Sequence, residues 1–159
     1  MTIELRAAVP EDVPTILRFV RELADYERAP DAVKATEPLL HKALFAAPPA
    51  AEAVIAERGG APVGFALFFH SFSTWEGRRG LYLEDLYVTP AARGSGVGTA
   101  LLRHLAGIAR DRDCARFEWA VLDWNAPAIA FYESMGAEAM DEWRIRRVSG
   151  DALARLAGR

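Results

Sequence analysis

The most constraining feature of this 159-residue sequence is a strand-like run followed at once by a glycine-rich loop and a helical pattern. Residues 81–88, LYLEDLYV, are aliphatic, aromatic and β-branched, and Pro90 ends the run. After the glycines, apolar residues recur at helical spacing through residues 99–110. We therefore predict a strand, a loop and a helix in succession, with the loop at the start of the helix.

The loop between the predicted strand and helix, R-G-S-G-V-G at residues 93–98, is suited to bind phosphate oxygens. Backbone N–H groups without bulky side chains at the positive end of a helix form an anion cradle, and Arg93 adds a cation. A P-loop lysine is lacking, and the third glycine of a Rossmann fingerprint would fall at Thr99. The alternatives are a glycine turn that only reverses the chain and another kind of nucleotide site.

Two motifs in this order resemble the GNAT superfamily of acetyl-CoA-dependent N-acetyltransferases. Residues 93–98 look like that family's pyrophosphate loop, and residues 123–136, D-W-N-A-P-A-I-A-F-Y-E-S-M-G, resemble its later N-x-x-[AS]-x-x-[FL]-Y-x-x-x-G signature. Within the superfamily the sequence is most similar to the spermidine/spermine (diamine) N-acetyltransferases, on the strings R-E-L-A-D-Y-E (21–27), V-G-F-A (63–66), L-Y-L-E-D (81–85) and W-N-x-P through F-Y (124–132).

The resemblance implies an enzyme that transfers acetyl from acetyl-CoA to a primary amine of a small cationic acceptor. Diamines, polyamines and lysine-like amino acids are the candidate acceptors. Polyamine-acetylating members tend to carry an acid where this sequence has Ser73, so longer polycations are expected to bind less well. The family is commonly homodimeric, and we expect the same here. A non-catalytic acyl-CoA-binding or sensor domain and an acetyltransferase for protein amines stay open as alternatives.

The element order predicts a single domain over residues 1–159 of the α/β (α+β) class, with a mixed, mostly antiparallel sheet flanked by helices. The resemblance implies a GNAT-like fold whose splayed parallel strand pair, residues 81–88 and 116–122, holds acetyl-CoA. The remaining strands are expected at 2–6, 53–57 and 63–71, a loop at 72–80, a hairpin at 137–148, and helices at 10–27, 36–45, 99–110, 127–134 and 151–156.

Composition sets limits on other functions. The net charge of −3 favours cationic small molecules over nucleic acid, and the 52% hydrophobic content suits a globular core. No apolar run approaches the roughly 20 residues that span a bilayer, so we expect a cytoplasmic protein without a membrane partner. Cys114 is the only cysteine, and the three histidines lack metal-site spacing, so no metal is expected.

Acetyl transfer to an amine requires a base, because an alkyl ammonium with a pKa of about 10.4 is protonated at neutral pH. Glu84 is our candidate, and the resemblance assigns it the same role; the alternative is a charge satisfied at a sheet edge. Strict strand alternation predicts that only one of Glu84 and Asp85 can face the cleft. The two predicted faces are Tyr82, Glu84, Leu86 and Val88 against Leu83, Asp85 and Tyr87.

Tyr132 is our candidate acid, since a phenol with a pKa near 10 can protonate a thiolate whose pKa is about 8.5. Its alternative role is that of a core aromatic, with Phe131 pointing about 100° away on the same helix. Asn125 suits either a helix cap or a bond to the pantetheine arm.

The remaining predicted contacts are those with the two substrates. For acetyl-CoA we expect Leu86, Tyr87, Val88, Arg93, Gly94, Ser95, Gly96, Val97, Gly98, Thr99, Asn125 and Ala128. For the amine, the resemblance implies Tyr26, Glu27, Glu84, Asp85 and Asp123, and the loop residue Trp75 is added as a candidate.

Overall fold

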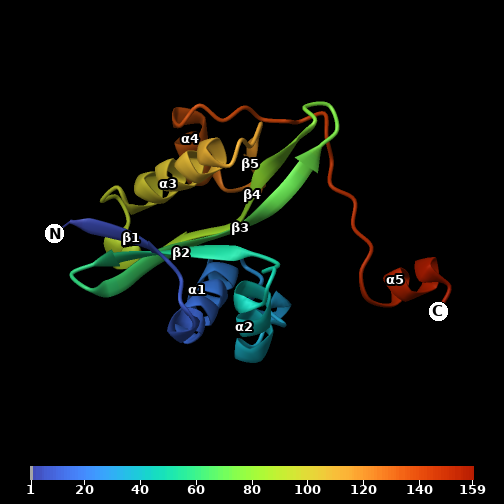
Figure 1. Cartoon of the computed structure of the whole chain (residues 1–159), viewed down its shortest axis with the longest axis horizontal. Coiled ribbons are helices and arrows are strands. Elements are labelled where there is room, and N and C mark those ends of the chain that lie inside the picture. Colours follow the sequence, from blue (N-terminus) through green and yellow to red (C-terminus); the bar gives the residue numbers. More distant parts are fainter. Residues whose placement is uncertain (1) are drawn as a thin grey trace. The chain divides into compact units, whose positions relative to one another are not determined.

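The structure, a computed structural model, describes residues 2–159. The chain forms two compact units, of which the first ends at Ala120 and the second comprises Val121–Arg159. Figure 1 shows the elements of both units. No helix within residues 2–159 is long and apolar enough to cross a bilayer.

A five-stranded sheet is the framework of the first unit, with its strands in sequence order. The β1–β2, β2–β3 and β3–β4 pairs are antiparallel, whereas β4 and β5 are parallel, which confirms the predicted mixed sheet. The strands are β1 (Ile3–Ala7), β2 (Glu52–Arg58), β3 (Ala61–Ser73), β4 (Arg78–Val88) and β5 (Phe117–Trp119). The helices are α1 (Val13–Tyr26), α2 (Glu37–Phe45) and α3 (Val97–Asp111), with short 3-10 helices η1 (Pro10–Asp12), η2 (Pro30–Ala32) and η3 (Pro90–Ala92).

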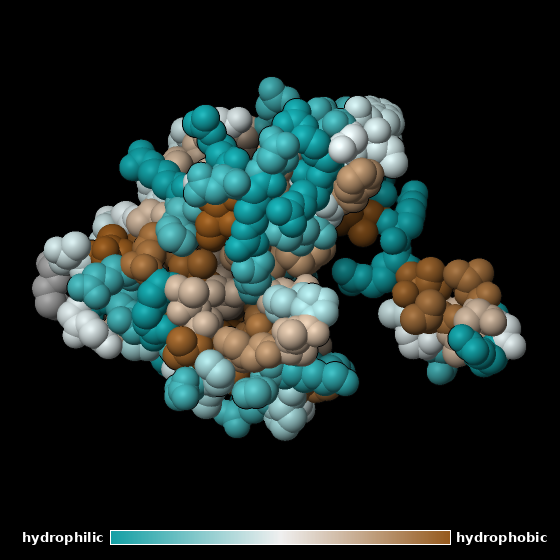
Figure 2. Space-filling model, in the orientation of Figure 1, coloured by the Kyte–Doolittle hydropathy of each residue, from teal (hydrophilic) through white to brown (hydrophobic). Residues whose placement is uncertain are grey.

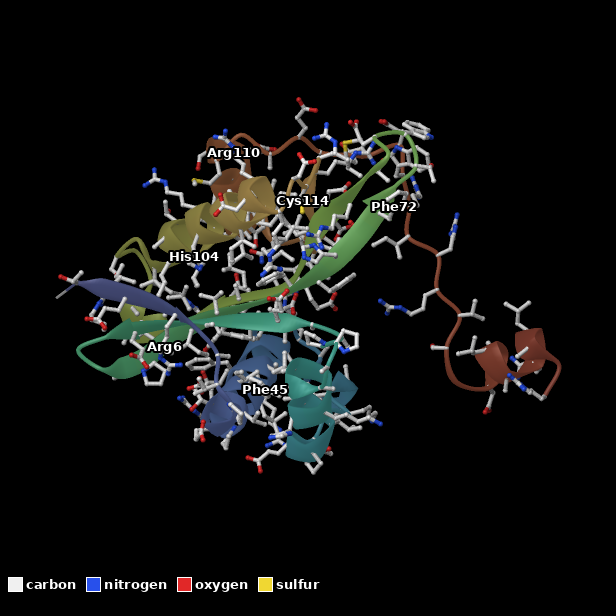
Figure 3. All side chains as sticks on the ribbon, viewed as in Figure 1. Arg6, Phe45, Phe72, His104, Arg110 and Cys114 are labelled. Carbon is white, nitrogen blue, oxygen red and sulfur yellow. The ribbon has the colours of Figure 1, made fainter. Side chains whose placement is uncertain are left out.

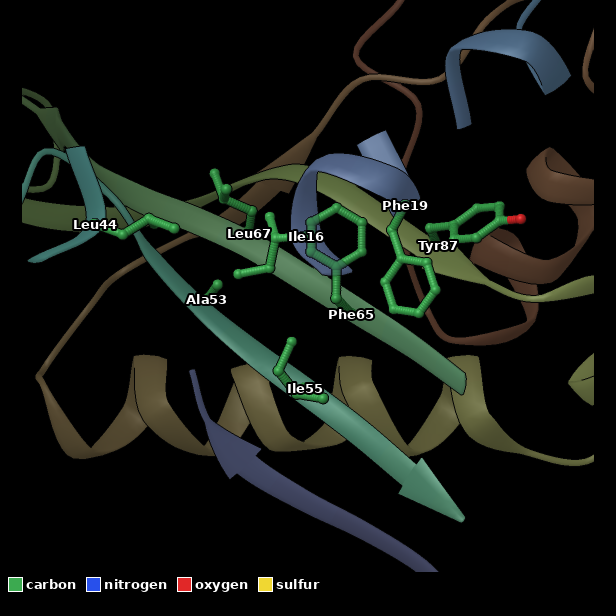
Figure 4. Close-up of a cluster of buried hydrophobic side chains, with 8 residues drawn as sticks. All are labelled: Ile16, Phe19, Leu44, Ala53, Ile55, Phe65, Leu67 and Tyr87. Carbon is green, nitrogen blue, oxygen red and sulfur yellow. The ribbon is translucent and has the colours of Figure 1, made fainter. Parts of the chain in front are cut away.

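The helices cover both faces of the sheet, with α1 and α2 on one face and α3 on the other (Figure 1). Under α1 and α2, the ring of Phe19 lies 5.8 Å from that of Phe65 and 5.5 Å from that of Tyr87. Fully burying a side chain of this size contributes about 1.5–3 kcal/mol. Figure 4 shows the cluster, which consists of Ile16, Phe19, Leu44, Ala53, Ile55, Phe65, Leu67 and Tyr87.

A β-bulge at Glu84 interrupts the alternation of β4. Asp85 pairs with Leu67 and Leu83 pairs with Phe68, so Glu84 is the extra residue on β4. The predicted faces are therefore wrong. Cross-strand partners share a face, which places one set beneath α1 and the other beneath α3. The α1 set is Tyr82, Asp85 and Tyr87, opposite Phe69, Leu67 and Phe65; the α3 set is Leu81, Leu83, Leu86 and Val88, opposite His70, Phe68, Ala66 and Gly64.

The same bulge marks the point at which the parallel strands separate. β4 pairs with β5 only over Leu81–Leu83, with Leu83 opposite Trp119, and it then continues to Val88 beside β3 alone. On the other side, Gly64 permits a close approach, because a Cβ there would lie 2.7 Å from the carbonyl oxygen of Tyr87. The carboxyl half of β4 is thus held by β3 and open toward β5.

The second unit contains α4 (Ala126–Ser134) and α5 (Gly150–Ala157), close to the helices predicted there. The hairpin predicted over 137–148 is wrong, since the structure has no strand in this stretch. Its alternating pattern has no buried face to pack, because Trp143 and Ile145 are exposed. In the first unit, the loop predicted at 72–80 is shorter, because β3 runs to Ser73 and β4 begins at Arg78.

Candidate functional site

Three acidic side chains interact electrostatically where the end of α1 meets β4. Glu27 caps α1 at its C-terminus, and Glu84 and Asp85 occupy the bulge and the next position of β4. Burial, followed by the charges of Glu84 and Glu27, raises the pKa of Asp85 to about 6. Burial and the charge of Glu84 also raise the pKa of Glu27. The prediction that only one of Glu84 and Asp85 faces the cleft assumed strict alternation along β4, and the bulge at Glu84 removes that assumption.

In the part of the chain that the structure describes, no ion pair involves Glu27, Glu84 or Asp85. Glu84 is exposed, while Asp85 and Glu27 are half-buried. Like charges held together without a cation repel one another, and the arrangement is suited to an ammonium ion supplied from solution.

The rings of Tyr26 and Tyr87 both lie near the Arg93 guanidinium. The Tyr87 hydroxyl donates to Glu22 Oε2 at 2.7 Å, and burial together with this bond raises the pKa of Tyr87 to about 12. The Arg93 guanidinium lies 5.3 Å from the ring centroid of Tyr26 and 5.7 Å from that of Tyr87. Arg93 Nε also donates to the carbonyl oxygen of Val88 at 3.0 Å. Arg93 thus links the glycine loop to the end of α1, a use of its side chain that the sequence did not indicate.

The glycine loop connects η3 to α3 and is open to solvent. Gly94 and Gly96 have φ angles of +75° and +89°, which glycine adopts without strain, and no atom lies within 4 Å of a Cβ built at either. Gly96 is the N-cap of α3, and the first backbone bond of the helix runs from Ala100 N–H to Gly96 O at 2.9 Å. Helix geometry leaves the N–H groups of Val97, Gly98 and Thr99 without intrahelical acceptors, as an anion cradle requires.

A second arginine at this loop was missed by sequence reasoning. Arg58, at the end of β2, donates from Nη2 to Ser95 Oγ, and Ser95 Oγ in turn donates to the carbonyl oxygen of Ala92. Arg58 and Ser95 are 37 positions apart. No motif or spacing in the sequence brings them together, because the contact depends on the pairing of β2 within the sheet.

Several predicted site residues belong to other parts of the molecule. Trp75 is 80% exposed in the turn before β4, whereas the glycine loop follows the end of that strand. The second unit carries the exposed Asp123 and the N-cap of α4, Asn125, whose Oδ1 accepts from the Ala128 N–H at 3.4 Å. This bond confirms the capping role predicted for Asn125.

The candidate acid Tyr132 is also in the second unit, on α4. Its ring centroid lies 5.5 Å from that of Phe131, and both side chains are half-buried. Neither is therefore a wholly buried core aromatic. The catalytic role of Tyr132 stays a prediction.

The carboxyl half of β4 in the first unit therefore connects a site suited to an anion with a site suited to a cation. The cradle at the start of α3 suits phosphate, and the carboxylates at the bulge suit a cation. Within residues 2–159, no group of three or more His, Cys, Asp or Glu side chains is arranged to hold a metal ion.

Comparison with known proteins bears on what this combination does. The sequence model described as the acetyltransferase (GNAT) family matches residues 17–137. The chain is similar to the thialysine N-epsilon-acetyltransferase of Bos taurus, with 39% identity across 98% of this chain and 97% of that protein.

Two further comparisons agree with this family. The chain is 34% identical to the spermidine/spermine N(1)-acetyltransferase-like protein 1 of Homo sapiens, across 97% of this chain and 24% of that longer protein. Among solved structures, an integron cassette protein from the mobile metagenome of V. cholerae superposes with a TM-score of 0.81 and 30% identity, covering 99% of this chain and 98% of that one.

Proposed function

The chain belongs to the GNAT acetyltransferase family, whose co-substrate is acetyl-CoA, and on this basis we propose that it acetylates the terminal amine of a small lysine-like acceptor. The observation that carries the choice of acceptor is the electrostatic coupling of Glu27, Glu84 and Asp85, which raises the pKa values of Glu27 and Asp85. We further propose that both compact units belong to a single acetyltransferase domain, because the family match from 17 to 137 crosses their boundary at Ala120.

In this proposal the start of α3 binds the diphosphate of acetyl-CoA, which supplies the acetyl group as an activated thioester. The N–H groups of Val97, Gly98 and Thr99 donate to phosphate oxygens, and the open backbone of Gly94 and Gly96 allows their close approach. The carboxyl half of β4, unpaired on the β5 side, offers backbone N–H groups near Leu86 and Val88 to the acyl end.

Glu84 is the proposed base that removes a proton from the ammonium group of the acceptor. Its exposure supports this role, because an exposed carboxylate can pass the proton on to water. Asp85 and Glu27 are proposed to hold the positive charge of the acceptor beside Glu84, together with Tyr26 at the end of α1. A cation bound there relieves the mutual repulsion of the carboxylates, which is the physical source of its affinity.

Tyr132 is the proposed acid that protonates the departing sulfur of CoA. A Tyr132→Phe variant is expected to reduce kcat by about 10²-fold or more, since it removes one proton donor from the transition state. Acetyl-CoA affinity, measured by calorimetry, should stay within about twofold because the phenol acts on the sulfur and not on the phosphates. Wild-type turnover by this variant would remove the acid role from Tyr132.

The acceptor is tested with a panel of amines and a continuous assay of thiol release. Thialysine, lysine, ornithine and short diamines are expected to be turned over with higher kcat/KM than spermidine or spermine, because Ser73 stands where polyamine-acetylating members of the family tend to carry an acid. Equal or better use of spermine would contradict the preference for lysine-like acceptors. Retention of CoA without thiol release for any amine would favour the non-catalytic alternative.

We also propose that the protein is a homodimer that uses its second unit. Apolar side chains of this unit are exposed, and Figure 2 shows apolar residues gathered on α5. The exposed large apolar side chains that follow α4 are Met140, Trp143, Ile145, Val148, Leu153 and Leu156. Sedimentation analysis is expected to give twice the chain mass, and a monomer at micromolar concentration would contradict the proposal. The cytoplasmic location predicted from the sequence stays a prediction.

A further inference from the structure

Arg58 joins the sheet to the glycine loop at the end where α3 begins. It pairs with Ile3 of β1 and Ala61 of β3, next to the turn between β2 and β3. Figure 1 shows this turn and the loop before α3 at the same end of the sheet. From there its Nη2 donates to Ser95, which lies between Gly94 and Gly96 in the loop.

The bonding of Arg58 is incomplete. Its Nε is buried and lacks a hydrogen-bond partner within residues 2–159, and no carboxylate there forms an ion pair with its guanidinium. Its contact in the loop is the neutral hydroxyl of Ser95. A guanidinium forms a stronger hydrogen bond with an anionic oxygen than with a neutral hydroxyl. A buried N–H group without an acceptor adds to the gain when an anion binds.

The other cation of the loop is engaged elsewhere. Arg93 lies over the rings of Tyr26 and Tyr87 and donates to the carbonyl oxygen of Val88. Arg58, in contrast, donates directly to a residue inside the loop, Ser95.

We propose that Arg58 is a ligand of the CoA diphosphate, exchanging its bond to the Ser95 hydroxyl for one to a phosphate oxygen when the cofactor binds at the loop. This inference rests on the proposed binding of acetyl-CoA at the start of α3. It assigns to the β2–β3 hairpin a part in donor binding, in addition to the loop that follows β4.

The test is calorimetric binding of CoA to the full chain. Arg58→Gln is expected to weaken binding roughly 10- to 100-fold, as expected for a lost charge-assisted hydrogen bond. Arg58→Lys keeps the charge but loses the fork of donors, so a smaller loss is expected. Arg110→Gln removes the same charge from an exposed position near the end of α3 and should stay within about twofold.

Two truncated ligands identify the group that Arg58 contacts. Dephospho-CoA keeps the diphosphate, so Arg58→Gln should weaken its binding by the same factor as that of CoA. Acetyl-pantetheine lacks the diphosphate and the 3′-phosphate, so the variant should use it, at saturating amine, with the kcat/KM of the wild type. A loss confined to CoA would assign Arg58 to the 3′-phosphate, and an equal loss with acetyl-pantetheine would indicate a structural role; either result overturns the proposal.

The same data separate this inference from the proposed function. If the wild type does not bind CoA, binding at the loop fails as a whole, whereas unchanged CoA affinity in Arg58→Gln with normal wild-type binding refutes only the role of Arg58. Thermal unfolding establishes that each variant is folded before titration. If Arg58→Gln does not fold, the lysine variant decides, and wild-type affinity for CoA in that variant counts against the proposed bond.

Discussion

Two groups of carboxylates in the first unit have opposite electrostatic surroundings. Near the start of α1, Arg6 donates to both oxygens of Asp12, at 2.7 and 2.9 Å, and to Glu57 Oε1 at 2.7 Å. These bonds hold the pKa of Asp12 below its ordinary value. Near the end of α1, burial and neighbouring acids raise the pKa values of Asp85 and Glu27 instead.

The difference is the presence of a resident cation. Arg6, on β1 (Figure 3), completes the first group and ties β1, β2 and the start of α1 together. The second group forms no ion pair in the described part of the chain. Burial, followed by neighbouring acids, makes Asp85 and Glu27 less stable as anions. We call the carboxylates paired with Arg6 the completed group and those without an ion pair the incomplete group. The completed group stabilises the fold, whereas the incomplete group is suited to bind a cationic ligand.

The largest effect on activity is expected from replacing the proposed base, Glu84. Glu84→Gln should lower kcat by about 10²–10³-fold, because the ammonium of the acceptor loses its proton acceptor. The loss should deepen as the pH falls from 8 to 6, where the amine is harder to deprotonate. Steady-state rates across this range measure it, with the exposed Glu4→Gln as the matched control. A small or pH-independent loss would transfer the base role to Asp85, whose pKa of about 6 also suits it.

A second variant removes the electrostatic penalty at Asp85. Its folded pKa of about 6 exceeds its ordinary value of 3.8, so the unfavourable charge develops, and stability falls, as the pH rises from about 4 to above 6. Asp85→Asn should therefore raise the free energy of unfolding by about 2 kcal/mol at pH 7.5 and by little at pH 4.

The same Asp85→Asn variant should raise the KM for the amine about tenfold, since one charge of the acceptor site is lost. Denaturant unfolding at both pH values and steady-state kinetics measure the two effects. Asp111→Asn, at the exposed end of α3, is the control. If Asp85→Asn lowered the free energy of unfolding and left the KM unchanged, Asp85 would stabilise the fold, as Asp12 does, and would not bind the amine.

The smallest effect on activity is expected when the completed group is broken. Arg6→Met leaves the buried Asp12 without its partner and should lower the free energy of unfolding by about 2 kcal/mol at pH 7, with kcat/KM unchanged. Because the pKa of Asp12 is lowered in the folded protein, wild-type stability should fall as the pH drops below about 4.

That acid dependence should be shallower in Arg6→Met, and unfolding at pH 2.5–7 measures it. The exposed Arg18–Glu22 pair, with an N···O distance of 3.2 Å, supplies a comparison: Arg18→Gln should cost only about 0.3–0.5 kcal/mol of stability. A comparable loss from both arginines would mean that burial of Asp12 contributes nothing.

The sequence by itself determined the order and type of most elements. The strand, loop and helix around residues 93–98 follow from local composition, from Pro90 and from apolar spacing, all of which act over a few residues. The parallel relation of β4 and β5 followed from the helical connection between them. The hairpin predicted at 137–148 was wrong because alternation does not supply a partner strand.

Only the tertiary structure decided how the site is arranged. The bulge at Glu84 arises from the register between β3 and β4, and this register breaks the strict alternation expected for Glu84 and Asp85. The approach of Arg58 to Ser95 likewise depends on the order of strands in the sheet. Local propensity selects strands, helices and turns, but charges far apart in the chain meet only when strand pairing and core packing bring their elements together.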